Sequence, residues 1–256
     1  MLAERSNISR GNLTLRQKAL RNHNLEEQAQ ALYKSWFIDF EPFKGGKFVD
    51  SELGMIPEGW RISSVVDLSQ RVASGGTPKS MNDSYYSGNI NWFTTKELKD
   101  CFLFSSEKKI TEEAVNNSSA KLFPSGTLLM AIYAAPTVGR LGILASDSTF
   151  NQAAVGIIPR DDIGVEYLYL TLLSEREKLN NLSSGAAQQN LNVGIVKDYK
   201  VIEPDSNTLR MFNRTIKSIF NLIKVNSSEN DRLIKSRDGL LPKLLSGELK
   251  INDLTC

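Results

Sequence analysis

The chain has few of the side chains that most often form catalytic and metal centres. Its 256 residues include one histidine and two cysteines. A structural zinc ion usually takes four cysteine or histidine ligands, so His23, Cys101 and Cys256 do not suffice for an ordinary zinc site. Two cysteines far apart in the sequence also predict no disulfide framework, which is typical of a reducing compartment. We therefore expect a cytoplasmic protein without a metal ion or an organic cofactor.

Long apolar runs and a strong net charge are absent as well. No stretch reaches the roughly 20 apolar residues that cross a bilayer, so we expect no membrane partner. The polar beginning of the chain does not resemble a signal peptide. The formal net charge is +2, from 31 basic and 29 acidic residues, which by itself does not indicate a nucleic-acid partner. Basic residues nevertheless outnumber acidic ones from Leu209 to Lys250.

The sequence also lacks the common motifs of nucleotide-binding and methylating enzymes. It contains neither a Gly-x-x-x-x-Gly-Lys-Ser/Thr phosphate loop nor a Gly-x-Gly-x-x-Gly turn. The Asn/Asp-Pro-Pro-aromatic stretch needed to methylate a base amino group is missing too. Asp205, Glu248 and Lys250 could suggest a nuclease, but they lie at opposite ends of a predicted helix, too far apart to share a metal ion. The sequence therefore favours a protein without catalytic activity of its own.

What the chain does have is a long helix, predicted from about Asp205 to about Leu245. Pro204 and Asp205 are typical of a helix start and Gly247 of a helix end. Residues recur at alternating steps of three and four, as in the a/d seam of a heptad repeat, which requires a partner helix. We expect Pro242 to kink the last turn. The apolar seam positions are Leu209, Phe212, Ile216, Ile219, Ile223, Leu233, Leu240 and Leu244.

A second helical pattern begins at Leu13 and ends before Pro42, after a polar segment, Met1–Asn12, that we expect to be frayed. Its seam includes Leu25, Leu32 and Trp36.

The two patterns fit an antiparallel pair in which Trp36 falls near Leu209 and Asn22 falls near Ile223, beside Asn226, so that the polar positions of the two seams coincide to within about a turn. Polar seam residues cost stability but fix register and orientation, which is our interpretation of Asn22, Asn226 and Asn230. The alternative is that these positions face solvent. Because the first helix is predicted to be the shorter one, part of the second has no partner in the chain. We expect another protein or a second copy to bind there.

Between the helices, short apolar runs bounded by Gly, Pro, Asn and Ser predict a mixed α/β globule. The fold class is thus α+β, with a globular domain flanked by two long helices that form an antiparallel coiled coil. Because the helices are not adjacent in sequence, the globule must bring its two ends together. The expected boundaries are 1–43 for the N-terminal arm, 44–203 for the globular domain and 204–256 for the C-terminal arm. The expected strands are Ile90–Phe93, Thr127–Tyr133, Leu141–Ala145, Ala153–Pro159 and Tyr199–Ile202, and the expected short helices are Val65–Arg71, Thr111–Val115 and Val165–Leu179.

Hydrogen-bonding and aromatic residues collect on the glycine-containing loops of this globule. Amides can form paired hydrogen bonds with adenine, and arginine or lysine with guanine, while hydroxyl groups can hold phosphates. Each residue alone could instead bond its own backbone in a turn or, for Tyr and Trp, belong to the core. As a set they favour a base-reading module, whose loops also carry Asn151 and Gln152. The candidate DNA-binding residues are Ser74, Thr77, Lys79, Ser80, Tyr85, Tyr86, Trp92, Lys96, Tyr133, Thr137, Arg140, Gln188, Gln189 and Asn190.

Several stretches resemble the specificity (S) subunits of type I restriction-modification systems. Leu25–Phe43 is similar to the central conserved region of that family. Ile56–Trp60 is similar to the start of its target-recognition domain, and Leu240–Leu249 to the end of its C-terminal conserved helix. The resemblance covers nearly the whole chain from Leu25 onward. Shorter motifs occur in the family's order at Ser74–Pro78, Phe123–Thr127, Gly139–Gly142, Asn151–Gln152 and Gly185–Leu191.

The resemblance implies a non-catalytic subunit that reads the sequence of double-stranded DNA while separate subunits methylate and cut. Its conserved helices would act as a ruler and dock methyltransferase subunits, through which the restriction subunit joins. The chain departs from the family pattern in having one target-recognition domain, one shortened leading helix and one full trailing helix, so it resembles half a specificity subunit. We expect two copies to pair and to read a symmetric, two-part site. Pairing with a dissimilar S polypeptide and an inactive fragment are the alternatives.

Two other classes of function stay open. An interaction scaffold would hold protein partners through its coiled coil while its globule reads no DNA. A stand-alone nuclease or methylase would show turnover with the single purified chain. The target sequence and the spacer length do not follow from the loops, because side chains cannot be assigned to base pairs without a register.

Overall fold

The computed structural model describes residues 2–79, 81–133, 136–182, 190–246 and 248. Two compact units make up the chain: Met1–Gln28 with Ile219–Cys256, and Ala29–Ser218. No helix in the described part of the chain is long and apolar enough to cross a bilayer. Several residues singled out above lie outside the described residues, namely Ser80, residues 185–189, Gly247, Lys250 and Cys256.

Both long helices are present. The C-terminal helix, α6 (Ser206–Leu245), has the predicted bounds almost to the residue. Its first turn is capped by Asp205, whose Oδ1 accepts hydrogen bonds from the backbone N–H groups of Asn207 (2.9 Å) and Thr208 (3.1 Å). The helix continues through Pro242, and the kink expected there stays a prediction.

The leading helix is longer than expected. Helix α1 (Leu2–Phe37) includes most of the Met1–Asn12 segment that we expected to be frayed, so the expected start at Leu13 was wrong, although α1 is still the shorter of the two long helices. Leu, Ala, Glu and Arg at its start are good helix formers, and extending an existing helix carries no further nucleation cost. Helix α1 has 36 residues and α6 has 40. The two lengths are nearly equal, so they do not support the expectation that a large part of α6 lacks a partner helix in the chain.

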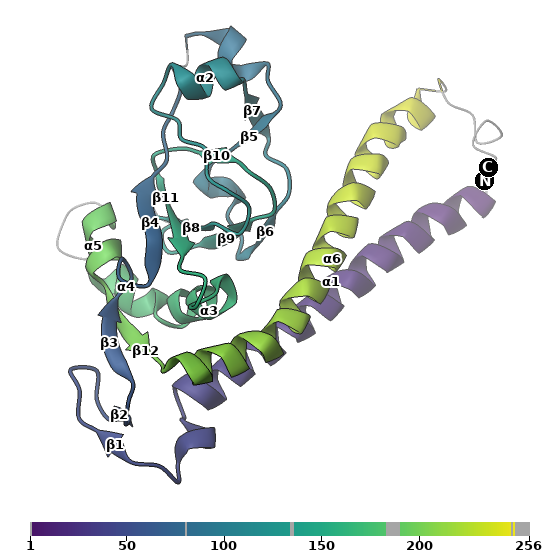
Figure 1. Cartoon of the computed structure of the whole chain (residues 1–256). Helices are drawn as coiled ribbons and strands as arrows, with labels where there is room; N and C mark the ends of the chain where they lie inside the picture. The colour runs from purple at the N-terminus through teal and green to yellow at the C-terminus, as the bar shows by residue number, and fades with distance from the viewer. Residues whose placement is uncertain (1, 80, 134–135, 183–189, 247, 249–256) are drawn as a thin grey trace. The chain divides into compact units, whose positions relative to one another are not determined.

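Within the first unit, α1 and α6 lie side by side (Figure 1), and polar side chains join them. Asn226 Nδ2 donates a hydrogen bond to Asn22 Oδ1 (2.9 Å), and Asn22 Nδ2 donates to Ser227 Oγ (2.9 Å). Lys18 forms an ion pair with Glu229. The earlier residue of α1 thus contacts the later residue of α6, which means that the two helices run in opposite directions. These contacts confirm the expected meeting of Asn22 with Asn226 and the antiparallel direction. Asn22 is only 9% exposed, which excludes the solvent-facing alternative for this residue.

The apolar seam of α6 is buried only along part of the helix. Leu209, Phe212, Ile216 and Ile223 are buried, whereas Leu240 is 39% exposed. Pairing as a coiled coil over the whole seam therefore stays a prediction.

In the second unit, the end of α1 and the start of α6 share an aromatic cluster. The Phe212 ring lies 4.7 Å from that of Phe37 and 5.8 Å from that of Trp36, measured between centroids. Trp36 thus contacts a residue one turn beyond Leu209, the expected neighbour. Tyr167, from a helix of the globule, joins the cluster with its ring 5.0 Å from Phe37.

The largest sheet of the globule has five strands in the order β4-β11-β8-β9-β6. Neighbouring strands are antiparallel except for β6 and β9, which are parallel. The expected helix Val65–Arg71 was wrong, because pairing with β11 holds the end of this segment in strand β4. The apolar spacing of Val65, Leu68 and Val72 is that of a helix, which is why the sequence favoured one. The strands are β4 (Ser69–Ser74), β6 (Cys101–Leu103), β8 (Leu128–Ala131), β9 (Leu141–Leu144) and β11 (Ala154–Pro159).

A second, three-stranded sheet has the order β10-β5-β7. Its first strand ends at Phe150, four residues before β11 begins, so the two sheets are joined by the short segment 151–153. Its strands are β5 (Ile90–Phe93), β7 (Lys108–Ile110) and β10 (Thr149–Phe150), and the helices beside it are η2 (Asp83–Tyr86), η3 (Thr95–Glu97) and α2 (Glu112–Asn116).

The two ends of the globule meet as expected. Strand β12 (Lys200–Glu203) pairs antiparallel with β3 (Arg61–Ser64), and Glu203 lies opposite Arg61. The expected helix Val165–Leu179 is divided at Glu175 into α3 (Val165–Ser174) and α4 (Arg176–Leu182). The expected inner side of α3 is confirmed, since Tyr167, Leu168, Leu170, Thr171 and Leu172 are buried. The remaining elements are η1 (Glu41–Phe43), β1 (Phe48–Val49), β2 (Ile56–Pro57) and α5 (Val193–Asp198).

Candidate nucleic-acid interface

One end of the five-stranded sheet gathers loops from distant parts of the sequence. Strands β4 and β8 end there, and β6, β9 and β11 begin there, because of how neighbouring strands pair. The pairs that fix this are Ser74 with Val155, Ala131 with Ala154, Met130 with Leu141, and Cys101 with Gly142. We call this end the loop edge; it consists of residues 75–79, 99–100, 132–133, 136–140 and 151–153.

Hydrogen bonds connect three of these loops. The Thr77 hydroxyl donates to Gln152 Oε1, which links the loop after β4 to the segment before β11. The Ile132 N–H donates to the Ala153 carbonyl (2.9 Å), so Tyr133 follows directly beside that segment. The Thr137 hydroxyl donates to the Tyr133 carbonyl (3.2 Å). Thr77, Tyr133 and Thr137, predicted separately, thus belong to one surface.

The other predicted residues differ in their exposure. Lys79 is exposed on the loop after β4, and Ser74 is half-buried at the end of that strand. The half-buried Arg140 is held by its backbone, which donates to the Thr137 carbonyl (3.0 Å). Lys96 is exposed on η3, and Asn190 is half-buried before the buried Leu191. Gln152 is exposed at the centre of the loop edge but is missing from the predicted set; its amide on a loop was the available signal.

Tyr85 and Trp92 are buried, unlike the exposed loop residues with which they were grouped, and their role in DNA binding stays a prediction. They are 9% and 7% exposed and belong to a cluster with Ile110, Ala114 and Ala120. A buried ring offers no face on which a base could stack. Apolar packing against the small sheet is the reason for their burial.

Two of the predicted aromatic residues instead hold the loop after β4. Trp92 Nε1 donates to the Gly76 carbonyl (2.9 Å), and the Tyr86 hydroxyl donates to the Pro78 carbonyl (3.0 Å). The Tyr86 and Trp92 rings are perpendicular, with centroids 6.0 Å apart. Burial raises the pKa of Tyr86, so its hydroxyl stays a neutral donor. These bonds fix the backbone on which Thr77 and Lys79 are placed.

Replacing Tyr86 by phenylalanine removes only the bond to Pro78. We expect the free energy of unfolding to fall by about 0.5–1.5 kcal/mol, the usual net contribution of one neutral hydrogen bond. Urea titration followed by circular dichroism measures this change. Tyr133→Phe, a matched control on an exposed ring, should be near neutral, and equal stability of the two variants would contradict the assigned bond.

Asp100 connects the opposite side of the loop edge to two helices. Its carboxylate accepts hydrogen bonds from the Arg176 guanidinium and from the Leu141 N–H (2.9 Å), and its carbonyl accepts one from the Tyr169 hydroxyl (3.1 Å). Its φ is 57°, a left-handed conformation that aspartate tolerates better than most residues. No local pattern pointed to this residue, because its partners lie on three separate elements.

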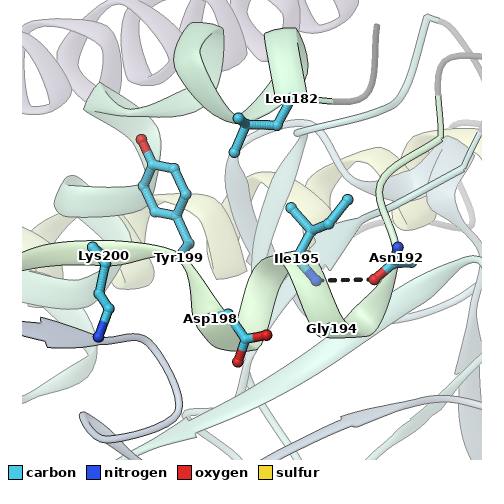
Figure 2. Close-up of a pocket in the computed structure, with 7 residues that line it drawn as sticks. All are labelled: Leu182, Asn192, Gly194, Ile195, Asp198, Tyr199 and Lys200. Carbon is cyan, nitrogen blue, oxygen red and sulfur yellow. Dashed lines mark hydrogen bonds between the residues drawn. The ribbon is translucent and has the colours of Figure 1, made fainter. Parts of the chain in front are cut away.

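A separate hollow of about 550 Å³ lies beside α4, α5 and β12 (Figure 2). Asn192 Oδ1 accepts a hydrogen bond from the Ile195 N–H (2.9 Å) and so caps α5. Tyr199 donates its hydroxyl to Glu175 Oε2 (2.6 Å), and burial together with this bond raises the pKa of Tyr199. Of the described residues that line it, Asp198 and Lys200 are charged, and none of these lining residues forms a pair of nucleophile and base. Among the described residues, no three His, Cys, Asp or Glu side chains gather in a way that could hold a metal ion.

Residues 57–234 match the family model of the type I restriction modification DNA specificity domain. The chain belongs to this family. The chain is 27% identical over 289 residues to the HindI specificity subunit of a type I restriction enzyme from Haemophilus influenzae, an alignment that covers 89% of this chain and 62% of that protein. It is 29% identical over 194 residues to the MjaIX specificity subunit from Methanocaldococcus jannaschii, covering 74% and 44% respectively. The specificity-domain chain thus spans about half the length of the curated relatives it matches.

Solved structures share its fold. The S subunit of a type I restriction-modification system from M. genitalium superimposes with a TM-score of 0.63 at 12% identity, covering 93% of this chain and 59% of that one. The HsdS subunit from Thermoanaerobacter tengcongensis gives a TM-score of 0.53 at 15% identity, covering 95% and 56%. The predicted α+β fold with long helices is therefore confirmed.

Proposed function

We propose that this specificity-domain chain is a DNA-recognition subunit of a type I restriction-modification complex, with no catalytic activity of its own. It reads one half of a two-part site in double-stranded DNA. The observation that carries the proposal is the loop edge, where exposed hydrogen-bonding side chains from three loops converge on one surface. Such side chains supply both the base contacts and the phosphate contacts of sequence-reading proteins.

The partners follow from the chain's length relative to its family. Two copies of this chain, or one copy and another S polypeptide, together provide about the length of polypeptide that the longer relatives have in one protein. The arms, 1–43 and 204–256, form the coiled coil that docks methyltransferase subunits and, through them, the restriction subunit, while 44–203 is the target-recognition domain. The exposed Leu240 and Leu241 on α6 support a partner at that end of the helix. Sedimentation that detects only monomer at high concentration would contradict the pairing of two copies.

The test of DNA reading uses the chain expressed with its methyltransferase subunits. Sequencing of modified bases across the host genome should give one methylated motif, and purified complex should bind a duplex with that motif more tightly than a scrambled duplex. A complex that methylates no motif and binds both duplexes equally would contradict DNA reading. It would support the scaffold function instead, in which the helices hold protein partners and the globule reads no DNA.

Replacing Lys79 by alanine should weaken binding to motif and scrambled duplexes by the same factor. A lysine that neutralises one phosphate releases about 0.9 counterion, so the slope of log affinity against log salt should fall by about 1. Fluorescence anisotropy between 50 and 200 mM salt, in the range where such slopes are usually measured, gives this value. Lys44→Ala, an equally large change of charge away from the loop edge, should leave the slope unchanged. An unchanged slope for Lys79→Ala would remove this lysine from the interface.

A further inference from the structure

Thr77 and Gln152 come from two separate motifs and form a pair across the loop edge. They are 75 positions apart, and the Thr77 hydroxyl donates to the amide oxygen of Gln152. A glutamine amide has acceptor sites on its oxygen and two N–H donors on its nitrogen. Thr77 takes one of the two acceptor sites of the oxygen, and the Nε2 N–H groups are the part of the side chain that can bind another acceptor. An exposed glutamine held in this way has lost side-chain freedom before any ligand arrives, which lowers the entropy cost of binding.

The backbone beneath this pair is fixed by close contacts. Gly76 N–H donates to the Phe150 carbonyl (2.9 Å), and Gly75 N–H donates to the Ala154 carbonyl (3.2 Å). A Cβ atom at Gly75 would lie 2.2 Å from the Phe150 carbonyl oxygen, and one at Gly76 would lie 2.1 Å from that of Ser119. Only glycine permits this approach, so the two loops keep one arrangement relative to each other.

The charge around the pair favours an anionic acceptor. Lys79 lies two positions beyond Thr77 and is exposed, and neither residues 74–79 nor residues 150–153 contain an acidic side chain. N–H donors and an ammonium group together suit a phosphate oxygen, which accepts hydrogen bonds and carries negative charge. A base edge would offer donors as well, for which the Gln152 oxygen has one acceptor site left beside the bond from Thr77.

We propose that Thr77 and Gln152 form a phosphate-binding pair that holds the DNA backbone independently of base sequence. Gln152 contacts the phosphate, Thr77 is a positioning residue that orients the amide, and Lys79 adds charge. The inference rests on the proposed function, because it requires that the loop edge faces DNA.

The experiment uses the complex with methyltransferase subunits and duplexes with and without the methylated motif. Gln152→Glu keeps the shape but replaces the N–H donors by a carboxylate oxygen that repels phosphate. We expect affinity to fall by roughly 10-fold or more for both duplexes, since a hydrogen bond to a charged group is lost. The methylated motif should stay the same. Gln152→Ala is made as well, and its matched control is Gln70→Ala, at the exposed glutamine of β4. The Gln70→Ala complex should bind as the wild type does.

A double-mutant cycle tests the role of Thr77. Thr77→Val removes the hydroxyl but keeps the shape, and it should weaken binding in the wild-type background but not in the Gln152→Ala background, because the hydroxyl acts through the amide. A changed base in the motif of a Gln152 variant would show that Gln152 reads a base and would overturn the proposal. Unchanged affinity of Gln152→Glu for both duplexes would overturn it too. If the wild-type complex bound no duplex, the proposed function itself would fail, an outcome seen before any variant is made.

Discussion

Replacing Phe212 by alanine is expected to lower the free energy of unfolding by about 3–5 kcal/mol, the usual cost of truncating a fully buried phenylalanine. Phe212 is completely buried, and its ring contacts those of Tyr33, Trp36, Phe37 and Tyr167. The truncation removes apolar contacts and leaves a cavity where α1, α3 and α6 meet, because rigid rings on three helices cannot move together to fill it.

Urea unfolding of the two variants Phe212→Ala and Met211→Ala provides the comparison. Met211 is the preceding residue on the same helix and is 54% exposed, so its truncation should change stability by no more than about 0.5 kcal/mol. Equal losses for the two variants would show that the aromatic cluster does not join the helices to the globule.

The second large effect is expected where the two ends of the globule meet. The Glu203 side chain is 5% exposed and pairs with Arg61 (2.6 Å) and Arg160 (3.0 Å). Removing both arginines leaves a buried carboxylate without a counter-charge, which costs about 3–5 kcal/mol. The Arg61→Ala/Arg160→Ala variant should therefore unfold at clearly lower urea concentration than wild type, whereas Arg210→Ala, on the exposed side of α6, should not.

The same pairing makes stability depend on pH. Burial alone would raise the pKa of Glu203, but hydrogen bonds from Arg61, Ser63 and Arg160 outweigh it and lower the pKa below its ordinary value. A lowered pKa in the folded state means that the paired carboxylate contributes stability above the unfolded pKa of about 4.3. That contribution is lost as the pH falls through the folded value. Glu203→Gln should thus be less stable than wild type at pH 7, and the difference should shrink as the pH falls below about 4. A difference that stayed constant as the pH fell well below about 4 would contradict the assigned ion pairs.

Much of the fold follows from local patterns in the sequence. The heptad seam placed α6, and the polar positions of the two seams predicted that Asn22 meets Asn226. Runs of apolar residues between turn residues located β5, β8, β9 and β11 to within a residue or two. These signals are local because neighbouring residues in the sequence determine the periodicity of each element.

What the sequence could not predict depends on contacts between distant segments. Strand β4 contains Ser69-Gln70-Arg71, which has no strand pattern, and forms only because β11 offers it a ladder. Tyr85 and Trp92 were placed on the DNA-binding surface, since a sequence does not show whether an aromatic ring beside a loop faces solvent or the core. The Thr77–Gln152 pair depends on the order of the strands, which the sequence did not reveal.

The ladder between β3 and β12 has a consequence for how the chain can change. Arg61 and Glu203 are 142 positions apart but lie opposite each other, so the intervening polypeptide leaves this ladder and returns to it at neighbouring points. Loops or whole strands within it can be lengthened, shortened or exchanged without altering the spacing of the two flanking strands, provided that the replacement also begins and ends at adjacent positions. A grafted globule that meets this geometric condition should therefore leave α1 and α6 attached as they are now.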